Sequence, residues 1–345
     1  MKKAYIRRYG AYGDLIHATH IPRLLKEKEG FDYVAVEYNP KGMAVWANNP
    51  FIDNHIHFDP YQPPICDYPA SFLQKRMDVI VREGNYDHCI DLNGSLEYGY
   101  IAMEDDNIYY QHESVRRERF GKWNYYDQNT IFAGYPQHVG MVGELFFTDE
   151  ERAMVENIFN REYKDNFVVI ANLSGTSKHK LFYDAKRIIS SFLDKHPESV
   201  CITMGDKDSA DNLEFDHPRV IKRSNIYPMR QSLLMTEYAD MVISAESGLP
   251  VMSTLSGTAT VQIMTAASIK NHGGDFPNDF SIQSTIACSP CHKGPYDYIG
   301  CPMFDHLGIK YPKCIKINAE LLLNRMEEAY DYARCKKANA KMSVV

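Results

Sequence analysis

The chain has 345 residues, enough for two domains of ordinary size, and its 44% hydrophobic and 24% charged residues are typical of a folded globular protein. A formal net charge of −7 argues against capture of nucleic acid by bulk electrostatics, although it leaves room for a local basic patch. No apolar run is long enough for a membrane-spanning helix or follows the basic N-terminus as in a signal peptide, so we expect a cytoplasmic protein whose eight cysteines are thiols or metal ligands.

The first part of the chain alternates strand-like and helical segments. Ala4–Arg8 predicts a strand, a loop with two glycines follows, and apolar residues at helical spacing then run to Lys26–Lys28. Further strands are predicted at 33–37, 54–58 and 88–92, and helices at 43–48 and 71–82. Such alternation favours a mainly parallel sheet. Residues 93–145 show no regular pattern, but they contain a basic and aromatic cluster: Arg116, Arg117, Arg119, Phe120, Lys122, Trp123, Tyr125 and Tyr126.

A second alternating series follows the amphipathic segment Thr148–Tyr163. It predicts strands at 167–171, 200–204, 219–222, 241–244 and 258–264, and helices at 182–195, 230–239, 249–255 and 318–333. We therefore predict an α/β chain with an N-terminal Rossmann-like domain at 1–150, a C-terminal one at 151–318, and a closing helix and tail at 319–345. Ligands of open parallel sheets bind beyond the carboxyl ends of the strands. We expect the site in a cleft between the domains, lined by 8–14, 92–95, 173–180, 205–208 and 245–248.

The loop after the first strand carries a candidate catalytic carboxylate. Its spacing, Gly10-x-x-Gly13-Asp14, is not the Gly-x-Gly-x-x-Gly fingerprint of dinucleotide-binding proteins, so NAD is not indicated. A carboxylate at this place is often only a helix cap. Both interpretations of Asp14, a cap and a functional group, stay open at this point.

Two loops of the second domain suit a diphosphate. Ser174–Lys180 offers hydroxyls, a glycine and cations, although it lacks the Gly-Lys-Ser/Thr ending of a P-loop. Glu246, Ser247 and Gly248 lie between a strand and a short helix, whose first amides can bind a phosphate oxygen, while the glutamate suits ribose hydroxyls. A solvated polar loop and a capped turn are the plainer alternatives.

Four cysteines lie close together in the sequence: Cys288, Cys291, Cys301 and Cys314. Two-residue spacing lets one turn supply two thiolates, and four thiolates suit a tetrahedral ion. We predict a finger at 286–316 that holds one structural zinc or iron ion, with His292 and His306 as possible substitutes; the alternative is unligated thiols. Four protein ligands leave no open position, so we expect no catalytic divalent metal.

Taken in order, these segments resemble the heptosyltransferase family of GT-B glycosyltransferases, which transfers heptose from ADP-heptose to the core of lipopolysaccharide. The resemblance covers about residues 4–318. It is carried by residues 7–26 ("RRYGAYGDLIHATHIPRLLK"), 49–53, 86–95 ("YDHCIDLNGS"), 174–180, 202–209 ("ITMGDKDS"), 242–263 and "CSPCHKG" from Cys288. The cysteine cluster is similar to the iron finger of autotransporter heptosyltransferases.

The resemblance implies roles for individual residues. Asp14 matches the family's general base, while Thr176 and Lys180 match its donor-diphosphate loop. The donor-binding residues expected on this basis are Gly13, Ser174, Thr176, Lys180, Gly205, Glu246, Ser247 and Gly248. The sequence departs from the family at Glu246, where the family has aspartate, and at Val251, where it often has histidine.

We therefore expect an inverting glycosyltransferase that moves a sugar from a nucleotide-diphosphate donor, with ADP-heptose as one candidate, to an acceptor hydroxyl. The acceptor is a glycan, a protein or a modified nucleobase. Two alternatives stay open: a nucleotide-sugar epimerase on the same fold, and a non-catalytic protein that binds a partner through the cluster at 110–126 and the cysteine finger.

Overall fold

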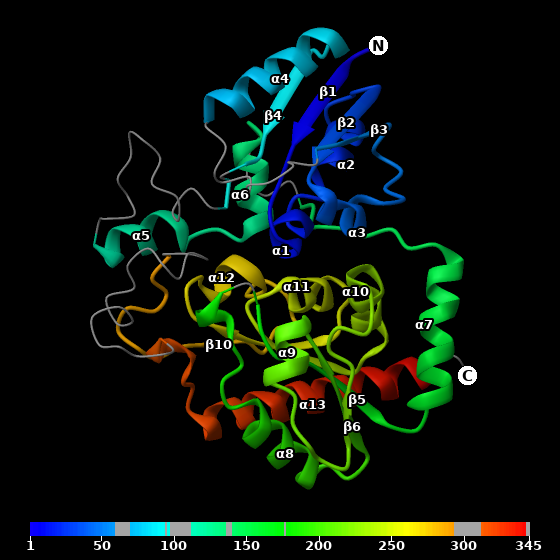
Figure 1. Cartoon of the computed structure of the whole chain (residues 1–345), viewed down its shortest axis with the longest axis vertical. Helices are drawn as coiled ribbons and strands as arrows, with labels where there is room; N and C mark the ends of the chain where they lie inside the picture. Colours follow the sequence, from blue (N-terminus) through cyan, green and yellow to red (C-terminus); the bar gives the residue numbers. More distant parts are fainter. Residues whose placement is uncertain are drawn as a thin grey trace. The chain divides into compact units, whose positions relative to one another are not determined.

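The computed structural model describes residues 1–58, 70–93, 95–96, 112–135, 140–175, 177–292 and 312–342. The chain divides into two compact units, Met1–Glu97 with Tyr125–Thr148, and Tyr98–Asn124 with Asp149–Val345. Each unit is built around its own parallel sheet (Figure 1). None of the helices within the described ranges is both long and apolar enough to cross a membrane.

The first unit contains a four-stranded sheet in the order β3-β2-β1-β4. Its strands are β1 (Lys3–Arg7), β2 (Tyr33–Tyr38), β3 (Asn54–His57) and β4 (His88–Asp91), and every pair is parallel. Its helices are α1 (Tyr12–Ile16), α2 (Ile21–Glu27), η1 (Pro40–Gly42), α3 (Met43–Trp46), α4 (Ala70–Gly84) and α6 (Tyr125–Phe132). The central strands β1 and β2 are almost wholly buried, as expected for a parallel sheet covered on both faces.

The second unit contains a six-stranded parallel sheet in the order β10-β9-β8-β5-β6-β7. The strands are β5 (Phe167–Asn172), β6 (Ser199–Met204), β7 (Val220–Lys222), β8 (Met241–Ala245), β9 (Ala259–Met264) and β10 (Ile282–Gln283). The helices are α5 (Glu113–Phe120), α7 (Asp149–Glu162), η5 (Lys178–Lys180), α8 (Ala185–Lys195), α9 (Lys207–Asn212), α10 (Met229–Tyr238), α11 (Gly248–Leu255), α12 (Ile269–His272), η7 (Lys313–Ile315) and α13 (Ala319–Met342).

The core of the second unit follows from the apolar pattern of its elements. All residues of β5, β8 and β9 are buried, and α8 buries one stripe of side chains against the sheet. The long helix α13 packs on α8 and on β8 and β9, so the closing helix completes this core rather than extending away from it.

These elements confirm the predicted α/β class with two Rossmann-like domains. One predicted helix is wrong in detail, because the apolar run after Gly13 forms two helices, α1 and α2, with a turn at 17–20. Pro22 lies in the first turn of α2, where its missing N–H costs nothing, whereas within one continuous helix it would break a hydrogen bond.

The segment 112–124, placed in the first domain by the sequence, groups with the second unit. The Asn271 side-chain amide donates to the carbonyls of Phe120 (2.6 Å) and Trp123 (2.8 Å), and Arg116 Nε donates to Cys291 O (2.6 Å). Much of the basic and aromatic cluster is thus engaged inside the molecule: Phe120, Tyr125 and Tyr126 are buried, and so is the Arg116 side chain.

Candidate functional site

Asp14 lies in α1, directly beyond the carboxyl end of β1. Asp14 Oδ2 accepts a hydrogen bond from the Ala11 amide at 2.9 Å, so the carboxylate does cap its own helix. Gly10 has a φ of +146°, and a Cβ atom there would lie 3.0 Å from Asp14 Oδ2. The glycine therefore allows the carboxylate to approach the loop backbone closely.

A buried carboxylate fixes the start of this loop. Glu37, fully buried in β2, accepts hydrogen bonds from the hydroxyls of Tyr5 (2.7 Å) and Tyr9, and from Arg76 Nε (3.0 Å). The Tyr9 amide also donates to Asn93 Oδ1 at 2.8 Å. Burial and the neighbouring Glu37 raise the pKa of both tyrosines well above its usual range, so the hydroxyls stay protonated donors.

Asn172, the last residue of β5, joins two of the predicted donor loops. Its Nδ2 atom lies 2.9 Å from Ser174 O, 3.1 Å from Ser244 Oγ and 2.8 Å from Ser247 Oγ. Because the Ser247 hydroxyl is held by side chains, it does not cap α11, whose N-terminus it precedes. Ser174 and Ser247 are thus brought together by a residue that the sequence analysis did not single out.

At two glycines near these loops, other atoms lie so close to the backbone that a Cβ atom would clash with them. A Cβ at Gly175 would lie 2.7 Å from Lys180 Cβ and 2.8 Å from Glu246 O. The lysine loop (174–180) and the glutamate turn (246–248) therefore lie side by side. A Cβ at Gly205 would lie 2.4 Å from Ser209 Oγ, and that hydroxyl is 2.6 Å from Ser174 Oγ. A side chain at Gly175 would have to displace Lys180 or the backbone at Glu246, and one at Gly205 would have to displace Ser209, which contacts Ser174. Thr176 lies outside the described residues.

Glu246 is buried, and its carboxylate accepts hydrogen bonds from the protein backbone. Its Oε1 atom accepts hydrogen bonds from the backbone amides of Thr265 (2.5 Å) and Ala266 (2.9 Å). Its Oε2 atom accepts none from any residue that the structure describes. One oxygen of Glu246 therefore has a structural role.

The cysteine finger is only partly described. Cys288, Cys291 and Cys314 are each half-buried, whereas Cys301 lies outside the described residues. Within the described ranges, no group of three or more His, Cys, Asp or Glu side chains is arranged to hold a metal ion. The three described thiols do not form a metal site by themselves, and the ion stays a prediction.

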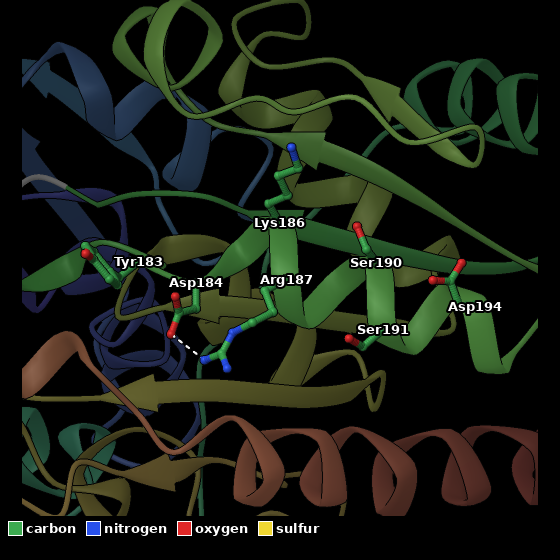
Figure 2. Close-up of a pocket in the computed structure, with 7 residues that line it drawn as sticks. All are labelled: Tyr183, Asp184, Lys186, Arg187, Ser190, Ser191 and Asp194. Atoms are coloured by element: carbon green, nitrogen blue, oxygen red, sulfur yellow. Dashed lines mark hydrogen bonds and ion pairs between the residues drawn. The ribbon is translucent and has the colours of Figure 1, made fainter.

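The described residues also line an open cavity of about 420 Å³ along α8, and none of the predicted site residues lines it. Figure 2 shows the side chains that line it, among them Lys186 and the ion pair between Asp184 and Arg187. It carries no nucleophile paired with a base, and it does not lie at the strand ends where α/β proteins bind ligands. We therefore place the candidate site at the loops after β5, β6, β8 and β9.

No protein-family model matches the sequence, and no curated protein matches it either. Several solved structures share its fold along nearly the whole chain. A family 9 glycosyltransferase from Veillonella parvula covers 95% of this chain and 97% of its own length, with a TM-score of 0.65 and 12% identity. The ADP-heptose lipopolysaccharide heptosyltransferase II of E. coli covers 97% and 100%, with a TM-score of 0.63 and 11% identity.

A third similar structure is the iron-containing dodecameric glycosyltransferase TibC of enterotoxigenic E. coli. It covers 96% of this chain, while 78% of its own length is covered, with a TM-score of 0.62 and 11% identity. At these identities the likeness shows the fold alone, and it confirms the GT-B architecture with two Rossmann-like domains.

Proposed function

We propose that the chain is an inverting glycosyltransferase that uses a nucleotide-diphosphate sugar. The observation that carries the proposal is the convergence of Ser174, Ser247, Lys180 and Glu246 at the carboxyl ends of β5 and β8. The similar folds are those of glycosyltransferases and heptosyltransferases, which supports the same class of reaction and makes ADP-heptose a candidate donor.

In the proposed reaction, the acceptor oxygen forms a bond to the anomeric carbon as the bond from that carbon to the diphosphate oxygen breaks. Asp14 takes the proton of the acceptor hydroxyl, because a hydroxyl is a poor nucleophile at neutral pH. Lys180 and the first amides of α11 stabilise the charge that develops on the departing diphosphate. Glu246 Oε2 accepts a hydrogen bond from the ribose.

The remaining predicted donor residues contribute backbone amides or hold the neighbouring loops in position. Gly248 opens α11, so its amide is among those that point beyond the helix toward an anion. Gly205 and Ser174 set the path of the neighbouring loops, and we keep Thr176 and Gly13 as donor contacts on the strength of the family resemblance. The acceptor, a glycan, a protein or a modified nucleobase, the structural ion and the cytoplasmic location stay predictions.

A screen of nucleotide sugars by thermal shift tests the donor, because a ligand that binds only the folded state raises its melting temperature. Release of nucleotide diphosphate that depends on an acceptor supports the transferase. Isomerised sugar without an acceptor would identify an epimerase instead. Binding with no turnover against any acceptor would favour a non-catalytic protein, although the cluster on which that alternative relied is largely engaged in internal contacts.

A further inference from the structure

Thr265, the first residue after β9, contacts two of the loops that the sequence analysis treated separately. Its hydroxyl lies 3.0 Å from His179 O in the lysine loop and 3.0 Å from Glu246 Oε1. Its amide donates to the same Glu246 oxygen at 2.5 Å. Thr265 is buried, so these contacts are shielded from water. A buried polar group that is left without a hydrogen-bond partner is costly in free energy.

Thr265 belongs to the turn at 264–267, which also contacts the cysteine segment, the described residues 286–292 of the predicted finger. Ser289, between Cys288 and Cys291, donates its hydroxyl to Thr265 O at 2.7 Å, and the His292 amide donates to Ala266 O at 2.8 Å. Gln283 Nε2 donates to the Ser289 oxygen at 2.9 Å and also lies 3.2 Å from Ala267 O. In the turn at 264–267, the amides of Thr265 and Ala266 therefore donate to Glu246, while the carbonyls of the same two residues accept from the cysteine segment.

We infer that the cysteine segment sets the position of the donor loops through this turn, and that Ser289 is a positioning residue for nucleotide-sugar binding. The inference rests on the proposed function, because it assumes that the loops around Lys180 and Glu246 hold the donor. It gives the segment a task that does not depend on which ion, if any, the thiols hold. Loss of the Ser289 hydroxyl removes one support of Thr265, which contacts both donor loops directly.

The test compares Ser289→Ala with Ser289→Thr, which keeps the hydroxyl, and with Ser256→Ala. Ser256 is a matched control: it is also half-buried and donates to a backbone carbonyl, that of Ser253 at 3.0 Å, but it precedes β9 and so lies at the amino end of the strand. Affinities for ADP and UDP are measured by calorimetry, together with KM for the donor, kcat and amide exchange at 264–268.

We expect Ser289→Ala to weaken binding of whichever nucleotide the wild type binds by about three- to tenfold, the range of one hydrogen bond, and to raise KM with little change in kcat. Exchange at 264–268 should become faster, and the other two variants should resemble the wild type. Unchanged affinity or exchange in Ser289→Ala, or an equal loss in Ser256→Ala, would overturn the inference. A wild type that binds no nucleotide diphosphate or nucleotide sugar would overturn the proposed function itself, and the inference with it.

Discussion

Asp14 Oδ2 and the Ala11 backbone nitrogen lie 2.9 Å apart, with the amide donating to the carboxylate. This contact satisfies the helix-cap interpretation of Asp14. The second carboxylate oxygen, Oδ1, makes no hydrogen bond to any described residue, and the side chain is half-exposed. Capping therefore occupies one oxygen of the carboxylate, and it does not exclude the proton transfer that we propose for the other.

Asp14→Asn separates the roles, because an amide oxygen can still accept from Ala11 but is a far weaker base. We expect turnover to fall by about 100- to 10,000-fold, the usual cost of losing a general base. Nucleotide affinity should largely persist, since all the predicted donor residues except Gly13 lie in the other unit. Melting temperature, affinity and turnover are measured on one sample.

The matched control for Asp14 is Asp87→Asn. Asp87 also accepts from a backbone amide, that of Lys3 at 2.8 Å, but it precedes β4 and lies at the opposite end of the sheet. It should leave turnover near normal. Near-normal turnover in a folded Asp14→Asn variant would remove Asp14 from the mechanism.

Lys180→Ala tests the diphosphate contact. The Lys180 ammonium group makes no ion pair with any described residue, so its charge is available to a ligand. A charge-assisted hydrogen bond contributes about 1.5 to 3 kcal/mol, so affinity for nucleotide diphosphate should fall by about ten- to a hundredfold. Lys186→Ala, on the exposed face of α8, is the control for general loss of positive charge. If affinity and turnover both stay unchanged in Lys180→Ala, the assignment is wrong.

The sequence predicted the alternation of strands and helices well because buried parallel strands are apolar throughout, as β5 and β9 are. It did not predict α5, whose outward positions are charged and whose buried face is small. That helix is held by two hydrogen bonds, from Arg116 to Cys291 O and from Asn271 to Phe120 O. Contacts between residues so far apart in the chain leave no local sequence pattern.

The sequence predicted only those residues of the candidate site whose side-chain type, such as a charged group, indicates a chemical role. Lys180 and Glu246 were singled out for their charge, although one Glu246 oxygen proves to hold backbone amides. Asn172 and Thr265 were missed, because an amide or a hydroxyl at the end of a strand is common and their importance comes from partners far along the chain. The short strand β10, of two residues, is too brief for any periodicity.

A buried pair of histidines predicts acid sensitivity of the first unit. Burial lowers the pKa of His17 to about 4 and that of His20 to about 3, below the ordinary value of about 6.5. The unfolded chain therefore binds protons first, and the stability that neutral histidines allow is lost as pH falls from about 6.5 toward about 4.

His20→Gln should weaken this dependence, since an amide does not titrate and can still face Thr130 Oγ1, which lies 2.9 Å from His20 Nε2. Urea unfolding at pH 7.5 and pH 5 gives the change in the free energy of unfolding. We expect a smaller change between the two pH values in His20→Gln than in the wild type, whereas the exposed His57→Gln should behave like the wild type. An equal change in all three proteins would contradict the prediction.

Arg117 holds α5 to the cysteine segment. Its guanidinium donates to the carbonyls of Ala287 (2.5 Å) and Pro290 (2.9 Å). Arg117→Met keeps most of the apolar stem but removes these donors, so we expect faster amide exchange throughout α5 and a free energy of unfolding lower by about 1 to 3 kcal/mol. Lys122→Met, exposed in the turn after α5, is the control, and similar exchange in both variants would show that Arg117 does not hold the helix.

The last prediction concerns the ion at Cys288, Cys291, Cys301 and Cys314. Elemental analysis of purified protein should find about one zinc or iron ion per chain, because four thiolates complete a tetrahedral site. Cys288→Ser should lower that content, whereas Cys335→Ser, an exposed thiol on α13, should not. Because Cys288 and Cys291 flank Ser289, removal of the ion should weaken nucleotide binding in the same direction as Ser289→Ala, without abolishing turnover at saturating donor. Protein that is folded and active yet carries no metal would reject the ion, and the turn at 264–267 would then depend on hydrogen bonds alone.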